Sequence, residues 1–344
     1  MNIKSLIVIV TYNSQNFIES CLRSVAGQDY KDWFLIVIDN ASTDNTITKI
    51  RQFRNISTEI TSSNFKFITL KKNIGFSRAV NQAVFDFIRK KIKSRDKEPE
   101  FLILLNPDVY LKKDAFKKII STFKFAEREN IPLRKAGVAG GLILDYKKDI
   151  VQHSGGKIKD NFITSHIDFG KSYPGLKREL KREKDNGSAA DTKKNIKDVD
   201  YVTGAFFATE FGLFKSIGGF DKGYRPVYFE ELDYCLKIRR TGRRIVVNSD
   251  SIARHFESAS VGKFSKRFYR YYHKNRIRCA VINTGFLDFF GKFLKEEMRW
   301  LRSMATREQI LPIFYAYFIN FVFLPYNLTI KLKNHLILNR LELK

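Results

Sequence analysis

The sequence has little cysteine, and this limits the chemistry it can use. Its three cysteines, Cys21, Cys235 and Cys279, are far apart in the chain. They are too few for a disulfide framework, and no pair has the C-x-x-C spacing of a metal knuckle. We therefore interpret them as small packing residues of a protein from a reducing compartment.

Long apolar runs are also missing. The N-terminal segment MNIKSLIVIVTYN has an apolar run of about five residues, shorter than the core of a secretory signal and typical of a strand. No uninterrupted apolar run reaches the roughly 18–20 residues that a membrane-spanning helix needs. The expected location is the cytoplasm.

Acidic residues are scarce relative to basic ones. The chain of 344 residues has 62 Lys and Arg against 36 Asp and Glu, a formal net charge of +26. Such an excess favours an anionic partner: nucleic acid, an anionic membrane or a phosphorylated substrate. With 44% hydrophobic residues, the chain can still bury a sizeable core.

The first 144 residues alternate between strand and helix patterns. Apolar, β-branched runs predict strands at LIVIV (6–10), FLIVID (34–39), FKFITL (65–70) and FLILL (101–105). This alternation is typical of right-handed βαβ units, and it predicts an α/β fold with a mostly parallel sheet covered by helices on both faces. The intervening helices are expected near 17–28, 45–54, 77–91 and 113–128.

The middle of the chain is less regular. Residues from about 171 to 197 include KREKDNGSAADTKKNIK and predict a charged, mobile insertion. Order is expected to return at YVTGAFFAT (201–209), followed by a helix over 228–242 and a strand over 244–250, with His255 after that strand.

Polar and acidic residues follow each of the first four predicted strands. Asp39, Asp44 and Asp108 lie in these loops, which a parallel sheet brings to one edge, where such folds bind ligands. Phosphates would be repelled by this edge unless a cation intervenes, and Mg²⁺ binds carboxylates together with phosphate oxygens. The sequence has neither G-x-x-x-x-G-K-[ST] nor G-x-G-x-x-G after the first strand, which argues against a P-loop and a dinucleotide fold. A metal-carried nucleoside diphosphate is the predicted ligand.

Eight segments, in order over about residues 5–262, resemble the inverting family-2 glycosyltransferases of the GT-A fold, a Rossmann-like nucleotide-diphospho-sugar transferase fold. The greatest similarity is to the bacterial rhamnosyltransferase-like enzymes that build cell-surface polysaccharide such as O-antigen or capsule. The segments are VIVTYNS (8–14), VIDNASTDNT (37–46), NIGFSRAVNQA (73–83), LLNPDV (104–109), TGAFFAT (203–209), IGGFDKGY (217–224), FEELDYCLKIRRTG (229–242) and HFESAS (255–260).

This resemblance implies a donor site for a dTDP- or UDP-linked sugar, rhamnose or another hexose. Asp39 corresponds to the residue that accepts the N3–H of uracil or thymine, whereas Asp44 and Ser42 better fit an Asx turn. Arg78 is expected either to reach the phosphates or to lie on a solvated helix face. The residues implied for the donor are Thr11, Tyr12, Asn13, Asp39, Asn40, Gly75, Arg78, Asn106 and Asp108.

The resemblance also implies a divalent metal. Asp108 corresponds to the last carboxylate of the family's Asp-x-Asp, while Asn106 replaces the first by a neutral amide. His255 corresponds to a histidine that can complete the metal shell. Since imidazole is not a preferred ligand of Mg²⁺, the pair leaves both Mg²⁺ and Mn²⁺ open and favours Mn²⁺.

The catalytic residues implied are Glu231, Glu230 and Asp233. Inverting transfer needs a base for the acceptor hydroxyl, and the family pattern Glu-Asp-x-Asp places it at Glu231, with Glu230 as the alternative. Acidic residues also stabilise the first turn of a helix without any catalytic role. On the leaving side, Arg254 is a further candidate to stabilise the diphosphate.

The last residues, 263–344, have sixteen Lys and Arg against five Asp and Glu, interleaved with aromatics. They predict a helical extension whose apolar section, 311–325, is cut by Pro312, Asn320 and Pro325. The extension either packs on the preceding domain, 1–262, or lies in a membrane interface. The second alternative suits a polyprenyl-diphosphate-linked saccharide acceptor at the inner face of the cytoplasmic membrane.

Two other functions stay open. The positive charge and the many Tyr and Phe would suit a nucleic-acid-binding protein, although acidic loops at one sheet edge would repel a phosphate backbone. The departures at Asn106 and Glu231 also fit an inactive transferase homologue that acts as an assembly partner.

Overall fold

The computed structural model describes residues 3–92, 98–125, 135–185, 195–256, 265–303 and 306–342. Its centre is a mixed sheet whose strands follow the order β10–β12–β6–β11–β4–β1–β2–β3. Six of these eight run in the same direction, because β11 is antiparallel to both β4 and β6 and β10 is antiparallel to β12. The strands are β1 (Ser5–Thr11), β2 (Trp33–Asp39), β3 (Phe65–Thr69), β4 (Phe101–Leu105), β6 (Ala136–Asp145), β10 (Ile196–Asp198), β11 (Phe206–Glu210) and β12 (Arg244–His255).

Both faces of the sheet are buried, which explains the unbroken apolar runs. In β1, Leu6 and Val8 belong to one core cluster, and Ile7 and Ile9 to the other. Since successive strand residues point to opposite faces, a strand covered on both sides needs apolar residues throughout. The predicted mostly parallel α/β sheet with helices on both faces is confirmed.

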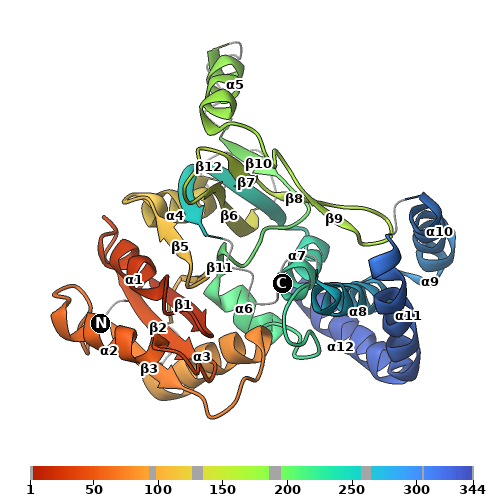
Figure 1. Ribbon diagram of the computed structural model, residues 1–344, viewed down its shortest axis with the longest axis horizontal. Coiled ribbons are helices and arrows are strands. Elements are labelled where there is room, and N and C mark those ends of the chain that lie inside the picture. Colours follow the sequence, from red (N-terminus) through yellow and green to blue (C-terminus); the bar gives the residue numbers. More distant parts are fainter. Residues whose placement is uncertain are drawn as a thin grey trace.

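Two sets of helices cover the two faces (Figure 1). The first core cluster contains apolar residues of α3 (Phe76–Lys91), α6 (Phe211–Ile217), α7 (Glu230–Arg240) and α8 (Lys266–Asn283). The second contains those of α1 (Ile18–Ala26), α2 (Thr46–Ile56) and α4 (Ala115–Phe125).

The middle of the chain differs from its prediction in two places. The predicted strand 244–250 continues to His255, because residues beyond a register shift between Asn248 and Ile252 still pair with β6 and with β5 (Val109–Leu111). The expected insertion contains a helix, α5 (Tyr173–Asp185), whose Leu176 and Leu180 are buried. Part of that predicted segment, 186–194, lies outside the described residues, as does 257–260 of the HFESAS motif.

Short strands complete the middle region. β7 (Val151–His153) pairs with β6, and β8 (Gly156–Ile158) forms a hairpin with β9 (Thr164–His166). This hairpin extends toward the C-terminal helices (Figure 1).

The C-terminal residues form the helical extension that the sequence predicts. After α8 come α9 (Phe286–Asp288), a π-helical turn (Phe289–Phe293), α10 (Leu294–Ser303), α11 (Arg307–Val322) and α12 (Leu324–Glu342). The apolar section is cut only once, at Phe323, and the helix pair bends there by 71°. Pro312 and Asn320 lie within α11, so the cuts predicted there are wrong. Proline removes a single backbone donor, and Pro325 is accommodated in the first turn of α12.

Candidate active site

The ends of β1 and β2 hold Asp39 in a closed hydrogen-bond arrangement. The Thr11 hydroxyl donates to Asp39 Oδ1 at 2.9 Å, and the Ser42 N–H donates to Asp39 Oδ2, also at 2.9 Å. Asp39 is fully buried, whereas Tyr12 is 40% exposed. The predicted turn at Asp44 is also present, since Asp44 Oδ1 accepts the Thr46 N–H at the start of α2. Asp39 itself therefore accepts a turn hydrogen bond, in addition to its predicted role toward a base.

The neighbouring loops extend the donor side. A hydrogen bond joins the loops that follow β1 and β2, since the Asn13 N–H donates to Ser42 Oγ at 2.9 Å. The Asn40 amide donates to Asn73 Oδ1 at 3.0 Å, and Asn40 Oδ1 accepts the Ile74 N–H at 2.9 Å. Thr11, Asn13, Asp39 and Asn40 thus lie at one sheet edge.

Gly75 and Arg78 contact a second loop. Gly75 has a φ of +85°, and a Cβ there would meet Pro226 O at 2.9 Å, so only glycine fits this close approach. The Arg78 Nε–H donates to Lys222 O at 3.4 Å. Both predicted donor residues therefore border the 220–226 loop.

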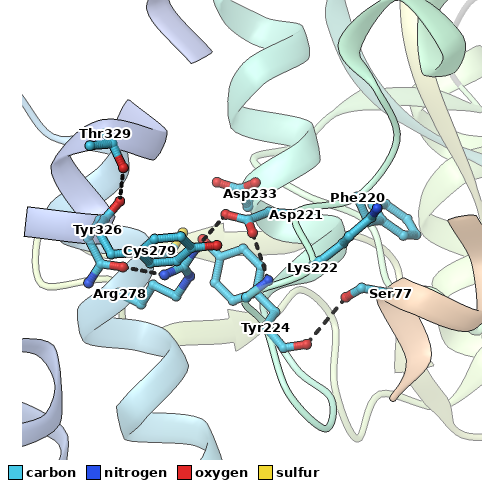
Figure 2. Close-up of polar contacts among 12 residues, drawn as sticks. Ser77, Phe220, Asp221, Lys222, Tyr224, Asp233, Arg278, Cys279, Tyr326 and Thr329 are labelled. Carbon is cyan, nitrogen blue, oxygen red and sulfur yellow. Dashed lines mark hydrogen bonds and ion pairs between the residues drawn. The ribbon is translucent and has the colours of Figure 1, made fainter. Parts of the chain in front are cut away.

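The 220–226 loop is fastened to the C-terminal helices by Arg278 (Figure 2). Arg278 of α8 forms an ion pair with Asp221 at 2.7 Å and donates to Asn327 of α12. Its guanidinium lies 5.4 Å from the ring centroids of both Tyr224 and Tyr326. The loop beside the donor residues is therefore held by the extension.

Asp108 and His255 meet although 147 residues separate them. β5 pairs with the end of β12 so that Val109 lies opposite His255, and His255 Nε2 is 3.2 Å from Asp108 Oδ1. The other ring nitrogen, Nδ1, is 3.1 Å from Gln152 Oε1, and Gln152 Nε2 donates to His255 O at 3.1 Å. Gln152 therefore orients the imidazole through the ring nitrogen that does not face Asp108. No sequence signal indicated this role of Gln152.

Glu231 lies at the same edge, beside the start of β11. Its Oε1 accepts the Gly204 N–H at 3.1 Å, and a Cβ on Gly204 would come within 2.2 Å of that oxygen. The next residue, Ala205, accepts the Asn106 N–H at 3.2 Å, where β4 ends. Glu231 and the Asn106–Asp108 loop therefore flank the same pair of strand ends.

The two neighbouring carboxyls have different environments. Glu230 is 2% exposed, and among the described residues none donates to its Oε2. Asp233 is also buried, where it pairs with Lys237 at 2.6 Å and accepts from the Asn283 amide of α8 at 2.7 Å. Glu231 is the member of the three that is partly exposed and directed at the strand ends.

Burial is the main cause of the raised pKa values of Glu230 and Glu231. Burial raises the pKa of Glu231 to about 7, although the N–H groups of Gly204 and of its own backbone oppose the shift. Burial and the neighbouring Glu231 raise the pKa of Glu230 well above its ordinary value. Near neutral pH, Glu230 is then a neutral acid and Glu231 can accept a proton.

The backbone before α7 is strained. Tyr228 and Phe229 have φ of +80° and +76°, values that bulky residues rarely adopt. The buried Asn275 of α8 donates to Val227 O at 2.8 Å and to Tyr228 O at 3.0 Å. Sequence reasoning missed Asn275 and Gly204, because both act across the fold.

Arg254 has polar partners of its own. Its guanidinium forms an ion pair with Asp149 and donates to Asp145 O at 3.0 Å. Its predicted contact with the leaving group would require those bonds to be exchanged.

Within the described ranges, no group of three or more His, Cys, Asp or Glu side chains could hold a metal ion. Asp108 and His255 supply one carboxylate and one imidazole, a set that fits a cation whose remaining ligands are phosphate oxygens and water.

A mostly parallel sheet, carboxylates at its strand ends and a Glu with a pKa of about 7 at the same edge are consistent with a sugar-nucleotide transferase of the GT-A fold. Residues 6–131 match the family described as glycosyl transferase family 2. The rhamnosyltransferase WbbL of Escherichia coli is 24% identical over 274 residues, covering 79% of this chain and 90% of WbbL. Residues 6–131 therefore match a family-2 glycosyltransferase domain, and the named relatives support a hexosyltransferase.

Two further matches cover most of this chain. A Methanococcus voltae enzyme named dolichyl N-acetyl-alpha-D-glucosaminyl phosphate 3-beta-D-2,3-diacetamido-2,3-dideoxy-beta-D-glucuronosyltransferase is 22% identical and covers 83% of this chain and 76% of its own length. The structure of Staphylococcus aureus TarS 1-349 in complex with UDP-GlcNAc has a TM-score of 0.54 at 17% identity, covering 91% of this chain and 79% of that one. This structural likeness confirms the predicted GT-A fold.

Proposed function

We propose that the chain transfers a hexose, such as rhamnose, from a dTDP- or UDP-linked donor to a saccharide during synthesis of cell-surface polysaccharide, with inversion at the anomeric carbon. The observation that carries this proposal is that Glu231, whose pKa burial raises to about 7, and the loop of Asp108, which pairs with His255, lie beside the adjacent ends of β11 and β4. The name of WbbL and the UDP-GlcNAc bound to TarS support the sugar and the donor class.

In the proposed reaction Glu231 is the general base. The acceptor hydroxyl oxygen attacks the anomeric carbon, its proton passes to a Glu231 oxygen, and the bond to the nucleoside diphosphate breaks. Such help is worth roughly 10²–10⁴-fold in rate. The Gly204 N–H holds Glu231 beside the strand ends.

Asp108 and His255 would hold a divalent cation, Mg²⁺ or Mn²⁺, with Gln152 orienting the imidazole. When bound, the ion would neutralise charge on the diphosphate leaving group. The imidazole ligand favours Mn²⁺.

The proposed acceptor is a saccharide linked to polyprenyl diphosphate, which places the enzyme in the cytoplasm, peripheral to the inner face of the membrane. The dolichyl phosphate in the name of the Methanococcus relative supports a lipid-linked acceptor.

The test is hydrolysis and transfer with dTDP-rhamnose, UDP-glucose, UDP-galactose and GDP-mannose, each with Mg²⁺ or Mn²⁺. We expect a dTDP- or UDP-sugar to be used. Asp108→Asn should raise the Mn²⁺ concentration needed for half-maximal turnover by about tenfold or more, since one charged ligand is lost. Asp44→Asn is the matched control, because asparagine also caps a helix.

A preference for GDP-mannose would contradict the role of Asp39. No turnover of any donor, with salt-sensitive binding to RNA or DNA instead, would favour the nucleic-acid alternative. No turnover and no such binding would favour an inactive homologue that acts in assembly.

A further inference from the structure

Helix α11 is apolar on two opposite faces. Ile313, Ala316 and Asn320 are buried against the rest of the protein. Leu311, Phe314 and Phe318 lie on the other side of the helix and are 65–76% exposed. A helix of a soluble protein normally has a polar outer face, so this exposed side lacks the covering it requires.

Helix α12 continues the pattern. Its exposed Leu328, Leu332 and Leu336 recur every four residues and therefore lie on one side of the helix. Residues 309–330, which run through both helices, contain no Lys, Arg, Asp or Glu. We call the exposed apolar side chains of the two helices the apolar face: Ile310, Leu311, Phe314, Phe318, Phe321, Val322, Phe323, Tyr326, Leu328, Leu332 and Leu336.

The geometry favours lying on a membrane over crossing it. Among the described helices, no single one is long and apolar enough to span a bilayer, and the pair that passes the test together is bent by 71°. A bent pair in which both helices expose apolar side chains suits the boundary between headgroups and acyl chains.

The charged residues near the apolar face indicate which partner would bind it. Exposed Arg307, beside exposed Glu308, precedes the uncharged stretch, and exposed Lys333 follows it together with Lys331, whose ammonium donates to Thr284 O. Exposed Arg302 and Arg299, which pairs with Glu296, lie on α10, shortly before α11, so the flanking charge is net positive. Anionic lipid attracts such flanking cations. A second copy of a chain with a net charge of +26 would instead bring like charges together.

Polar and cation–π contacts hold the two helices of the apolar face against the rest of the protein. Asn327 of α12 accepts from Arg278, which is ion-paired with Asp221, and Tyr326 lies against the same guanidinium (Figure 2). Asn320 of α11 donates to Lys274 O of α8 at 2.9 Å. The two helices are thus presented without an ordering cost at binding.

We propose that the apolar face binds the surface of an anionic phospholipid bilayer, with α11 and α12 lying in the interface. This deepens the peripheral membrane location given under the proposed function, on which it rests, by naming the surface of the chain that makes the contact. It does not depend on the identity of the donor.

The test is co-sedimentation of the full chain with vesicles of phosphatidylglycerol and phosphatidylethanolamine. We expect binding that weakens with salt and is weaker on phosphatidylcholine alone. The variant Phe314→Ser/Phe318→Ser/Phe321→Ser should lower the partition coefficient by about tenfold or more, because three exposed aromatic anchors are lost. Ile56→Ser, at an equally exposed apolar residue of α2, is the matched control and should bind normally.

A second variant, Leu332→Ser/Leu336→Ser, tests α12 separately and should also bind less. Unchanged vesicle binding by both variants would overturn the proposal. So would loss of a dimer on substitution, seen by sedimentation velocity without vesicles, because the face would then be an interface between copies. Hydrolysis of a soluble nucleotide sugar should persist in both variants, so failure of this proposal and failure of the proposed function can be told apart.

Discussion

At the scale of single residues, the adjacent carboxyls Glu230 and Glu231 differ because their surroundings differ. Glu230 is buried, and none of the described residues donates to its Oε2, whereas Glu231 accepts the Gly204 N–H and is partly exposed. A fully desolvated carboxyl stays protonated, while a carboxyl with a donor and some access to water can titrate near neutrality. The family pattern favoured Glu231 as the base and left Glu230 as the alternative, and the different burial of the two side chains could not be read from that pattern.

Glu231→Gln should lower kcat by roughly 10²–10⁴-fold, because the base is lost. In the wild type, log kcat/KM should rise with pH and level off above about 7, the pKa of Glu231, since only the ionised form accepts a proton. The variant should lose that rise. Glu19→Gln, in an exposed ion pair of α1, is the control and should keep it. A rise that persists in Glu231→Gln would contradict the assignment.

The same substitution also carries a stability prediction with a definite sign. The pKa of Glu231 is raised from 4.5 to about 7 on folding, so its ionisation destabilises the folded state as pH rises through this interval. A tenfold change in proton affinity corresponds to about 1.4 kcal/mol, so the glutamine variant should be more stable than wild type by up to roughly 3 kcal/mol at pH 8. The difference should vanish near pH 4, as measured by urea unfolding.

At the scale of elements, helix α7 is positioned by a strained connection that another helix supports. Tyr228 and Phe229 have left-handed backbone conformations, and the Asn275 amide of α8 donates to the carbonyls of Val227 and Tyr228. The strain persists because the surrounding structure compensates for it. The direction in which Glu231 leaves the helix thus depends on α8.

Asn275→Ala should reduce kcat while leaving the donor KM nearly unchanged, since it moves the base and not the donor loops. It should also cost about 1–3 kcal/mol of stability, because two carbonyls lose their donor. Asn320→Ala is the matched control: this buried amide also donates to two carbonyls, but to those of Lys274 and Ala316. An equal loss of kcat in both variants would show a general effect of instability.

At the scale of the whole molecule, the extension and the sheet domain share a core. Ile277, Cys279 and Ala280 of α8 belong to the same core cluster as β1 and β2. The guanidinium of Arg276, fully buried, pairs with Glu297 of α10 at 2.6 Å, and Glu297 also accepts from Asn161 at 3.0 Å. Separate segments are therefore joined by one buried charge pair.

Glu297→Ala should lower the free energy of unfolding by about 3–5 kcal/mol, because Arg276 would be left as an unpaired buried charge. The extension and the sheet domain should melt in a single transition, followed by circular dichroism. Glu296→Ala breaks only a pair with the exposed Arg299 and should cost less than about 1 kcal/mol. Two separate melting steps would contradict the shared core.

The sequence by itself determined the α/β class, the strand FLILL at 101–105, the order of the N-terminal helices and the similarity of residues 6–131 to family-2 glycosyltransferases. These follow from local periodicity and from contiguous motifs, which need no knowledge of distant contacts. The division at residue 262, the site roles and the membrane location stay predictions.

Only the tertiary structure decided which side chains meet. The pairing of β5 with β12 brings His255 to Asp108, the start of β11 brings Gly204 to Glu231, and α8 brings Asn275 to the strained turn. It also gave Asp233 and Arg254 ion-pair partners, Lys237 and Asp149, that the sequence did not indicate. Hydrogen bonds and desolvation act over a few ångströms, and the chain distances between these partners are too long for any local pattern to indicate them.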